Sequence, residues 1–348
     1  MTIIVDRTSL QTFAAQVFTK AGLPPADAEI ESKVLVWANL RGVDSHGVMR
    51  IPSYVSSIEK GGMNPRPNIQ VVKETPAMSL IDADWAFGPV VTTFAMKQAI
   101  AKAKAVGIGW ILIRNTTHQG AMAYYTLMAA EQGLAGIAVV CNPPNMAPYG
   151  ARVAGLHNSP ISFAVPTKER RPLVLDMATS VAAGGKLSLA LDKGIEIPLG
   201  WALDKEGKPT TSPGKAAALL PFGGYKGSGL AMMFECFSSL MVGNPLVARK
   251  LTGQSIHPGS QNSFVAALDI SMFTDLETYK DDADELIDLI KGLPKADGVD
   301  EIFVPGEIEN RVYDQRANEG IPLPDGTARN LAEVAQKLNV PVPEWLQP

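Results

Sequence analysis

Apolar side chains recur at helical spacing through the first 62 residues of the chain. Phe13, Val17 and Ala21 lie four residues apart, as residues on one face of a helix do. Glycines commonly follow the last turn of a helix. The pattern predicts three helices: one that ends at Gly22, one that runs from Pro24 through Val34, Leu35 and Ala38, and one from an N-cap at Asp44 or Ser45 to Gly61-Gly62.

From Ile69 onward, short runs rich in Val and Ile alternate with longer runs of helical periodicity. The predicted strands are Ile69–Val72, Met78–Ile81, Ile108–Ile113, Ala135–Cys141, Ile161–Val165, Leu173–Leu175 and Phe264–Asp269. The predicted helices are Val90–Ala105, Ala121–Gln132, Val181–Leu191, Gly229–Met241, Asp275–Ile290, Ile308–Glu319 and Thr327–Leu338. Such alternation is typical of α/β proteins.

The chain has 348 residues, which exceeds the roughly 250–300 residues at which single hydrophobic cores stop growing. Helical patterns at both ends flank the α/β centre. We therefore expect two lobes. Residues 1–75 together with 307–348 would form a helical lobe, and residues 76–306 a central α/β domain.

Composition excludes several classes of protein. The net charge is −4, and the chain has no basic stripe, so nucleic acid is not an expected partner. The N-terminus lacks the pattern of a signal peptide, which predicts a cytoplasmic protein. The longest apolar run, Gly229–Gly243, is interrupted by Glu235 and is too short to cross a membrane. This run predicts a buried helix.

The cysteines and two of the four histidines carry no recognisable motif. Cys141 and Cys236 lie far apart and belong to no CxxC or His-rich pattern, so neither a disulfide nor a zinc site is expected. Both read as core thiols. His157 and His257 lie in loops rich in Pro or Gly, and we expect both at the surface.

The window Arg41–Arg50 concentrates the most chemistry. His46, Arg50 and Tyr54 follow one another at intervals of four, so on one helix they would share a face. This places an acid/base group beside a side chain that can hold an anion. Pro52 lies in the same segment and predicts a kink in that face.

Two further segments follow predicted strands, where α/β proteins commonly place ligands and acid/base groups. His118 lies in Asn115–Gly120, although a capping or core role would equally explain it. Asp176 follows the strand Leu173–Leu175, and a carboxylate there needs a partner. The hydroxyl residues after it are explained by helix capping.

The chain lacks the usual phosphate-binding motifs. No GxGxxG occurs, and Gly184-Gly185-Lys186 lacks the remaining residues of a P-loop, so an ordinary Rossmann site is disfavoured. Pro221–Leu230 is a glycine-rich turn before a helix. Its backbone N–H groups and Lys226 could hold an anion, or the turn could be a flexible loop with its lysine in water.

Seven segments, in this order, resemble the malate/L-lactate dehydrogenase family of the second type. That family is distinct from the Rossmann-fold lactate and malate dehydrogenases, and includes ureidoglycolate dehydrogenase, diketogulonate reductase, sulfolactate dehydrogenase and the piperidine-carboxylate imine reductases. The segments are Arg41–Arg50, His118–Tyr125, Ala147–Gly150, Ser159–Ala164, Asp176–Thr179, Gly223–Gly227 and Pro305–Glu307.

The resemblance implies a homodimeric NAD- or NADP-dependent oxidoreductase whose nucleotide-binding domain has a non-Rossmann mixed sheet. The site would lie between the lobes and near the dimer interface, with the helical lobe contributing to substrate binding and dimerisation. His46 and His118 match the family's proton donors or acceptors, while Arg50 and Tyr54 match its substrate contacts. The positions that match nucleotide contacts are Asn142, Asp176, Met177, Ala178, Lys226, Gly227, Pro305, Gly306 and Glu307.

Two segments depart from the family pattern. Relatives commonly have His-Phe-Gly at His118-Gln119-Gly120, and Gly-Thr-Asn-Pro at His157–Pro160. Both lie near the expected site. The departures therefore concern the identity of the substrate more than the class of reaction.

The expected reaction is hydride transfer between a nicotinamide and C2 of a small 2-hydroxy or 2-oxo acid. Arg50 would bind the carboxylate, and His46, slightly favoured over His118, would exchange the proton. Asp176 would orient the acting histidine or only hold the nucleotide turn.

Three alternatives remain open. The substrate could be a cyclic or N-substituted 2-imino acid. Lys226 or Lys186 could bind pyridoxal phosphate as a Schiff base. The chain could also be a metabolite-binding protein without catalysis.

Overall fold

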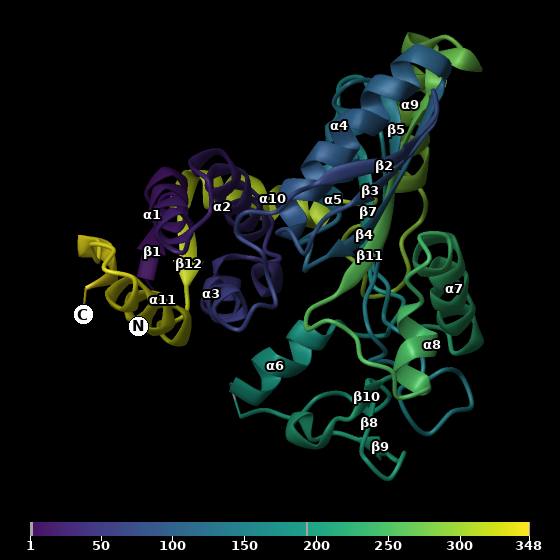
Figure 1. Cartoon of the computed structure of the whole chain (residues 1–348). Helices are drawn as coiled ribbons and strands as arrows, with labels where there is room; N and C mark the ends of the chain where they lie inside the picture. The colour runs from purple at the N-terminus through teal and green to yellow at the C-terminus, as the bar shows by residue number, and fades with distance from the viewer. Residues whose placement is uncertain (1–2, 193, 348) are drawn as a thin grey trace.

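A mixed seven-stranded sheet forms the centre of the computed structural model, which describes residues 3–192 and 194–347 (Figure 1). In spatial order its strands are β2 (Gln70–Glu74), β3 (Met78–Asp82), β4 (Ile108–Thr116), β11 (Gln261–Asp269), β5 (Leu134–Cys141), β6 (Ile161–Val165) and β7 (Leu173–Met177). β3 and β4 are parallel, whereas the other neighbours are antiparallel. The predicted α/β class with a mixed sheet is confirmed.

Helices pack on both faces of this sheet. On one face, α4 (Gly88–Val106) and α5 (Ala123–Ala130) bury a core with Ile111, Ile113 and Val265 of the central strands. On the other face, Phe234 of α7 (Tyr225–Glu235) packs with Cys141 and Phe264. The sheet is thus sandwiched between two layers.

The two ends of the chain pack together beside the sheet (Figure 1). β1 (Ile3–Val5) pairs antiparallel with β12 (Ile321–Leu323). A shared apolar core joins Leu10 and Phe18 to Leu331. The surrounding helices are α1 (Arg7–Lys20), α2 (Pro25–Leu40), α3 (Ile51–Glu59), α10 (Glu307–Glu319) and α11 (Asp325–Lys337).

The division at residues 75/76 stays a prediction. β2 lies before residue 75 yet pairs with β3 in the large sheet, so that sheet begins before the expected boundary.

A second, small sheet in the order β10, β8, β9 lies beyond α6. The remaining bounds are α6 (Gly184–Asp192), β8 (Ala202–Leu203), β9 (Pro209–Thr210), β10 (Ala218–Leu219), α8 (Leu246–Leu251) and α9 (Leu276–Lys291). Within residues 3–192 and 194–347, no helix is long and apolar enough to span a membrane.

The apolar helix predicted at Gly229–Met241 differs from the structure in two respects. It begins at Tyr225 and becomes a π-helix over Cys236–Leu240. It is also not buried, because Met232 is 61% exposed and Met233 51% exposed. An apolar run in a sequence does not show what packs against it, and in the single chain Met232 and Met233 remain more than half exposed.

The segment after α2 is not one kinked helix, so the shared helical face predicted for His46, Arg50 and Tyr54 is wrong. Two 3-10 turns, Asp44–His46 and Val48–Arg50, precede α3. Pro52 lies in the first turn of α3, where its missing N–H costs nothing.

Gly47 separates the two turns because a side chain there would collide with Asn39. An ideal Cβ at Gly47 would lie 2.2 Å from Asn39 Oδ1. That oxygen accepts a hydrogen bond from Val48 N at 2.8 Å, and Asn39 Nδ2 donates to Asp44 Oδ1 at 2.7 Å. Asn39 thereby holds both turns against α2.

We expect Gly47→Ala to lower the free energy of unfolding by about 1–3 kcal/mol, because the new methyl group must displace the bonded Asn39 amide. Urea denaturation measures the change. Gly229→Ala is the control, since a Cβ at Gly229 meets open space inside a helix and should be neutral or stabilising. Equal urea midpoints for the two variants would show that the close approach of Asn39 does not require glycine at position 47.

Candidate active site

Two histidines from distant parts of the chain lie together. His46 comes from the first 3-10 turn, and His118 from the loop between β4 and α5. Their ring centroids are 5.3 Å apart, with 26° between the ring planes. The sequence analysis had assigned both to one site, and the structure brings them together.

The hydrogen bonds of His118 determine its neutral tautomer. Nδ1 lies 2.5 Å from the Tyr54 hydroxyl and 3.3 Å from the backbone nitrogen of Gly120. A backbone N–H can only donate, so Nδ1 accepts and the neutral ring carries its hydrogen on Nε2. Tyr54, which was expected to contact substrate, is buried and contacts His118.

Arg50 is fixed beside the histidines by the turn that carries His46. Its Nε donates to the carbonyl oxygen of Ser45 at 2.6 Å, and the Ser45 hydroxyl lies 2.9 Å from His46 Nδ1. Within the described part of the chain, the two terminal amino groups of the Arg50 guanidinium have no hydrogen-bond partner. They are available to a carboxylate.

Burial and positive charge keep both imidazoles neutral at pH 7. Burial lowers the pKa of His46 to about 4, and the Arg50 charge adds to the shift. The pKa of His118 is held well below its usual value, first by burial and then by the charges of His46 and Arg50. Burial, with Glu31 nearby, raises the pKa of Tyr54, so the phenol stays protonated.

The Asp176 carboxylate contacts the first residue of α5 and not the histidines. It accepts a hydrogen bond from Ala123 N at 2.7 Å. Asp176 is exposed as a residue, but the surrounding chain shields its carboxylate from water, and this desolvation raises the pKa of Asp176 to about 6. The Ala123 N–H and the Arg41 charge act in the opposite direction and lower this pKa. Asp176 therefore anchors the start of α5, which follows the His118 loop.

Two of the segments expected to bind nucleotide, Met177-Ala178 and Lys226-Gly227, meet at the start of α7. Gly223 and Gly224 adopt φ values of 54° and 60°. A Cβ at Gly227 would lie 2.4 Å from Thr179 O, so only glycine lets the turn after Met177-Ala178 approach this closely. Lys226 is exposed at the same end of α7, and Asn142 lies half-buried at the end of β5.

The Pro305–Glu307 turn lies against β7, the strand that leads to Asp176. Val174 N donates to Pro305 O at 3.3 Å. Glu307 accepts from Lys291 Nζ at 2.6 Å and from Val304 N at 3.2 Å, so its carboxylate stabilises this turn.

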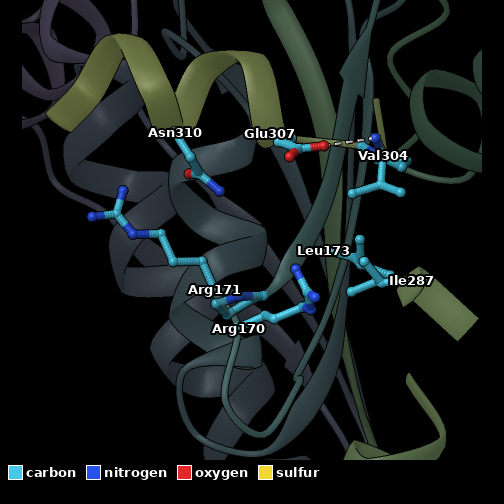
Figure 2. A pocket seen from close by; sticks show the side chains of 9 residues that line it. Arg170, Arg171, Leu173, Ile287, Val304, Glu307 and Asn310 are labelled. Atoms are coloured by element: carbon cyan, nitrogen blue, oxygen red, sulfur yellow. Dashed lines mark hydrogen bonds between the residues drawn. The ribbon is translucent and has the colours of Figure 1, made fainter. Parts of the chain in front are cut away.

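A recess of about 250 Å³ adjoins this turn and contains neither histidine (Figure 2). Arg170 and Arg171 line it, and both are paired, with Asp288 and Asp314 respectively. Its walls are Arg170, Arg171, Pro172, Leu173, Ile287, Val304, Pro305, Glu307 and Asn310. The recess borders the Pro305–Glu307 turn but neither the other expected nucleotide segments nor the acid/base cluster.

A family model described as malate/L-lactate dehydrogenase matches residues 5–332. The chain belongs to this family. The same assignment had rested on seven short segments of the sequence, and it is confirmed. A dehydrogenase family leaves no support for the pyridoxal phosphate hypothesis or for a protein without catalysis.

Relatives in the malate/L-lactate dehydrogenase family match end to end. A malate dehydrogenase from Pyrococcus horikoshii is 39% identical over 97% of this chain and 96% of its own length. An L-sulfolactate dehydrogenase from Methanocaldococcus jannaschii is 39% identical over 95% of this chain and 96% of its own. The solved structure of a delta1-piperideine-2-carboxylate reductase from Pseudomonas syringae is 27% identical, with a TM-score of 0.84 over 95% of this chain and 99% of its own.

The sequence analysis overlooked residues that hold the His46 turn in place. Arg316 of α10 donates to Asp44 Oδ1 at 2.7 Å and thereby ties the C-terminal helices to the His46 turn. No local pattern links positions 272 residues apart. Ser45 was considered only as a helix cap. Its position between Asp44 and His46 was the signal that could have indicated its contact with the histidine.

The expectation for His157 is wrong, because its side chain is completely buried. Its ring lies 3.0 Å from Glu235 Oε2. Burial lowers the pKa of His157, but Cys141 and then Glu235 outweigh burial and raise it to about 9. His257 is half-buried and stacks on Trp85, with 3.7 Å between ring centroids. Of the cysteines expected in the core, Cys141 is buried and Cys236 half-buried.

Proposed function

We propose that the protein transfers a hydride reversibly between a nicotinamide nucleotide and C2 of a small 2-oxo or 2-hydroxy acid. The observation that carries the proposal is the convergence of His118, His46 and Arg50, with the Arg50 amino groups free of protein partners among the described residues. The substrates named for the relatives, malate and sulfolactate, are 2-hydroxy acids and agree with it.

Arg50 binds the substrate carboxylate. A guanidinium whose Nε is fixed by Ser45 O presents its outer amino groups as a planar pair, and this pair matches the two oxygens of a carboxylate. Such a bidentate contact also orients C2 for hydride delivery.

His118 exchanges the proton with the C2 oxygen, in preference to His46. The substrate carboxylate offsets the Arg50 charge that lowers the histidine pKa, so the bound complex favours a protonated His118. The Tyr54 hydroxyl can then accept from Nδ1–H, because a hydroxyl both donates and accepts. During reduction the protonated ring passes its Nε2 proton to the C2 oxygen and is left neutral, with its remaining hydrogen on Nδ1 and donated to the Tyr54 hydroxyl. During oxidation this Nδ1–H tautomer takes the proton back on Nε2.

The nucleotide is held by the turns that meet at α7. The Thr179 hydroxyl is buried without a hydrogen-bond partner in the described residues, next to the closely packed Gly227, and the exposed cation of Lys226 in the first turn of α7 favours phosphate. Met177 and Ala178 lead into Thr179, Asn142 follows β5, and Pro305-Gly306 packs on Val174 of β7. NAD or NADP, when bound, supplies or accepts the hydride.

A substrate screen tests this function. The purified protein is assayed with pyruvate-like and dicarboxylic 2-oxo acids, each with NADH and with NADPH, by the loss of nicotinamide absorbance. Turnover of at least one acid is expected, and the better nucleotide gives the cofactor preference. Failure on every acid with both nucleotides would overturn the proposal.

Reduction of a cyclic 2-imino acid is the second candidate. It is favoured by the structural similarity to the delta1-piperideine-2-carboxylate reductase. The same arginine would hold the carboxylate, and His118 would protonate nitrogen in place of oxygen. Including cyclic imino acids in the screen separates the two functions.

The exposed apolar side chains of α7 and of the π-helix that follows it support a homodimer. Exposed side chains there include Leu230, Met233 and Phe237, and Glu235 of the same stretch is buried, so the surface carries little charge. A twofold axis would place this surface against its own copy, which suits an uncharged, self-complementary patch. The turns at the start of α7 would then lie near the partner subunit.

We expect the double variant Met233→Lys/Phe237→Lys to be monomeric, because two buried charges per subunit would oppose association. Light scattering coupled to size exclusion measures the mass. Val106→Lys, at an exposed apolar position on α4, should remain dimeric and is the control. A dimeric double variant would place the interface elsewhere.

A further inference from the structure

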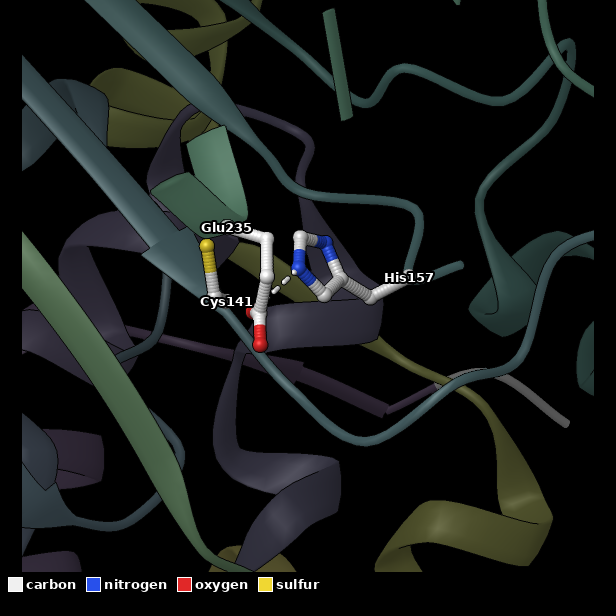
Figure 3. Close-up of side chains that lie close together, drawn as sticks. All are labelled: Cys141, His157 and Glu235. Carbon is white, nitrogen blue, oxygen red and sulfur yellow. Dashed lines mark hydrogen bonds and ion pairs between the residues drawn. The ribbon is translucent and has the colours of Figure 1, made fainter. Parts of the chain in front are cut away.

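Three side chains that the proposed reaction does not use converge at the end of β5 (Figure 3). Cys141 ends β5, His157 lies in the loop before β6, and Glu235 is the last residue of α7. One ligand-type atom from each, sulfur, nitrogen or oxygen, lies within 4.8 Å of the other two. All three residues are buried.

The outer atoms of the cluster are held as they are around bound metal ions. His157 Nδ1 is hydrogen-bonded to the Ser159 hydroxyl, so its Nε2 points toward Glu235. Glu235 Oε1 accepts from Val247 N at 3.0 Å, which leaves Oε2 on the side of His157. Partners of this kind orient the ligands of metal sites and fix the histidine tautomer.

The backbone also changes form at this point. α7 gives way to the π-helix Cys236–Leu240 directly after Glu235. Short π-helical segments are rare and occur frequently at functional sites.

We propose that Cys141 Sγ, His157 Nε2 and the Glu235 carboxylate bind a divalent metal ion of the zinc type. A thiolate, an imidazole and a carboxylate are the three ligand types that Zn²⁺ takes in proteins. A thiolate and a carboxylate together balance the charge of the ion, which a buried site requires. The sequence analysis expected no zinc site because the cysteines belong to no CxxC or His-rich pattern, and these three ligands lie 16 or more positions apart.

The proposed ion has a structural role. It would join the end of β5, the loop before β6 and the end of α7. Within the described residues, neither member of the stacked pair His46 and His118 belongs to the metal-binding cluster. Zn²⁺ sites commonly have four ligands, so water or a nearby hydroxyl would complete the set.

Cobalt substitution tests the proposal without using activity. Metal content is first measured on the purified protein, which is then stripped with a chelator and titrated with Co²⁺. One equivalent should produce a thiolate-to-cobalt band in the near ultraviolet and visible bands of a four-coordinate ion. Zn²⁺ in excess should abolish the bands and raise Tm by about 3–5 °C.

Cysteine variants assign the sulfur ligand. Cys141→Ser should lose the thiolate band, whereas Cys236→Ser, which replaces the other cysteine of the chain, should keep it. His157→Asn should weaken Co²⁺ binding at least tenfold.

Two results would overturn the proposal. In the first, the wild-type protein carries no metal as purified and gives no stoichiometric Co²⁺ spectrum, which leaves a buried His157–Glu235 ion pair. In the second, Cys236→Ser abolishes the band. The wild-type titration decides the matter even where a variant fails to fold.

Discussion

We expect His118→Ala to lower turnover by about 10²–10⁴-fold, the usual contribution of a positioned acid/base group. The reason is that Tyr54 and Gly120 orient this ring through Nδ1, which leaves Nε2 for the substrate. Steady-state kinetics with the acid found in the screen measures the effect. Nucleotide affinity, followed by fluorescence titration, should change little.

His46→Ala is the matched control, because His46 stacks on the same ring but is bonded to Ser45. We expect it to cost about tenfold or less. The reverse order of effects would assign the proton to His46, as the sequence alone had slightly favoured.

The pH profile gives a second view of the same group. His118 is needed in its neutral form for oxidation, and its pKa in the free protein is lowered by burial, His46 and Arg50. The oxidation kcat/KM should therefore be flat at neutral pH and fall only on the acid side of pH 6.5, which is the ordinary histidine value. A fall beginning above pH 7 would contradict the lowered pKa.

The sequence predicted the members of the acid/base cluster better than their arrangement. His46 and Arg50 were found from their spacing, which assumed one helix. The structure puts them in two 3-10 turns, because Gly47 must lie against Asn39 and Pro52 can only begin α3. Their proximity survives since the Arg50 Nε bonds back to Ser45 O.

Most strands of the central sheet were predictable, because its buried strands are continuous apolar runs in the sequence. The pairing of β1 with β12 was not, since each strand has three residues and their partners lie at opposite ends of the chain. The burial of His157 was equally hidden, because its partner Glu235 is 78 residues away. Long-range polar pairs leave no periodic signal in a sequence.

Arg50→Gln is expected to lower kcat/KM for every acid substrate by about 10²–10³-fold. A buried hydrogen bond to a charged group contributes about 1.5–3 kcal/mol, and a bidentate pair somewhat more, where about 1.36 kcal/mol corresponds to tenfold. Kinetics on the best acid measures the loss. Lys60→Gln, an exposed cation beyond the end of α3, is the control and should leave kcat/KM unchanged.

The same variant should move the pH profile in a definite direction. Arg50 lowers the pKa of both His46 and His118, so its removal raises them toward the ordinary histidine value. The acid side of the oxidation profile should then shift to higher pH. If Arg50 only stabilised the fold, Arg50→Gln would lower activity without shifting the acid side of the oxidation pH profile. An unshifted profile would therefore show that Arg50 does not interact electrostatically with the residue that carries the proton.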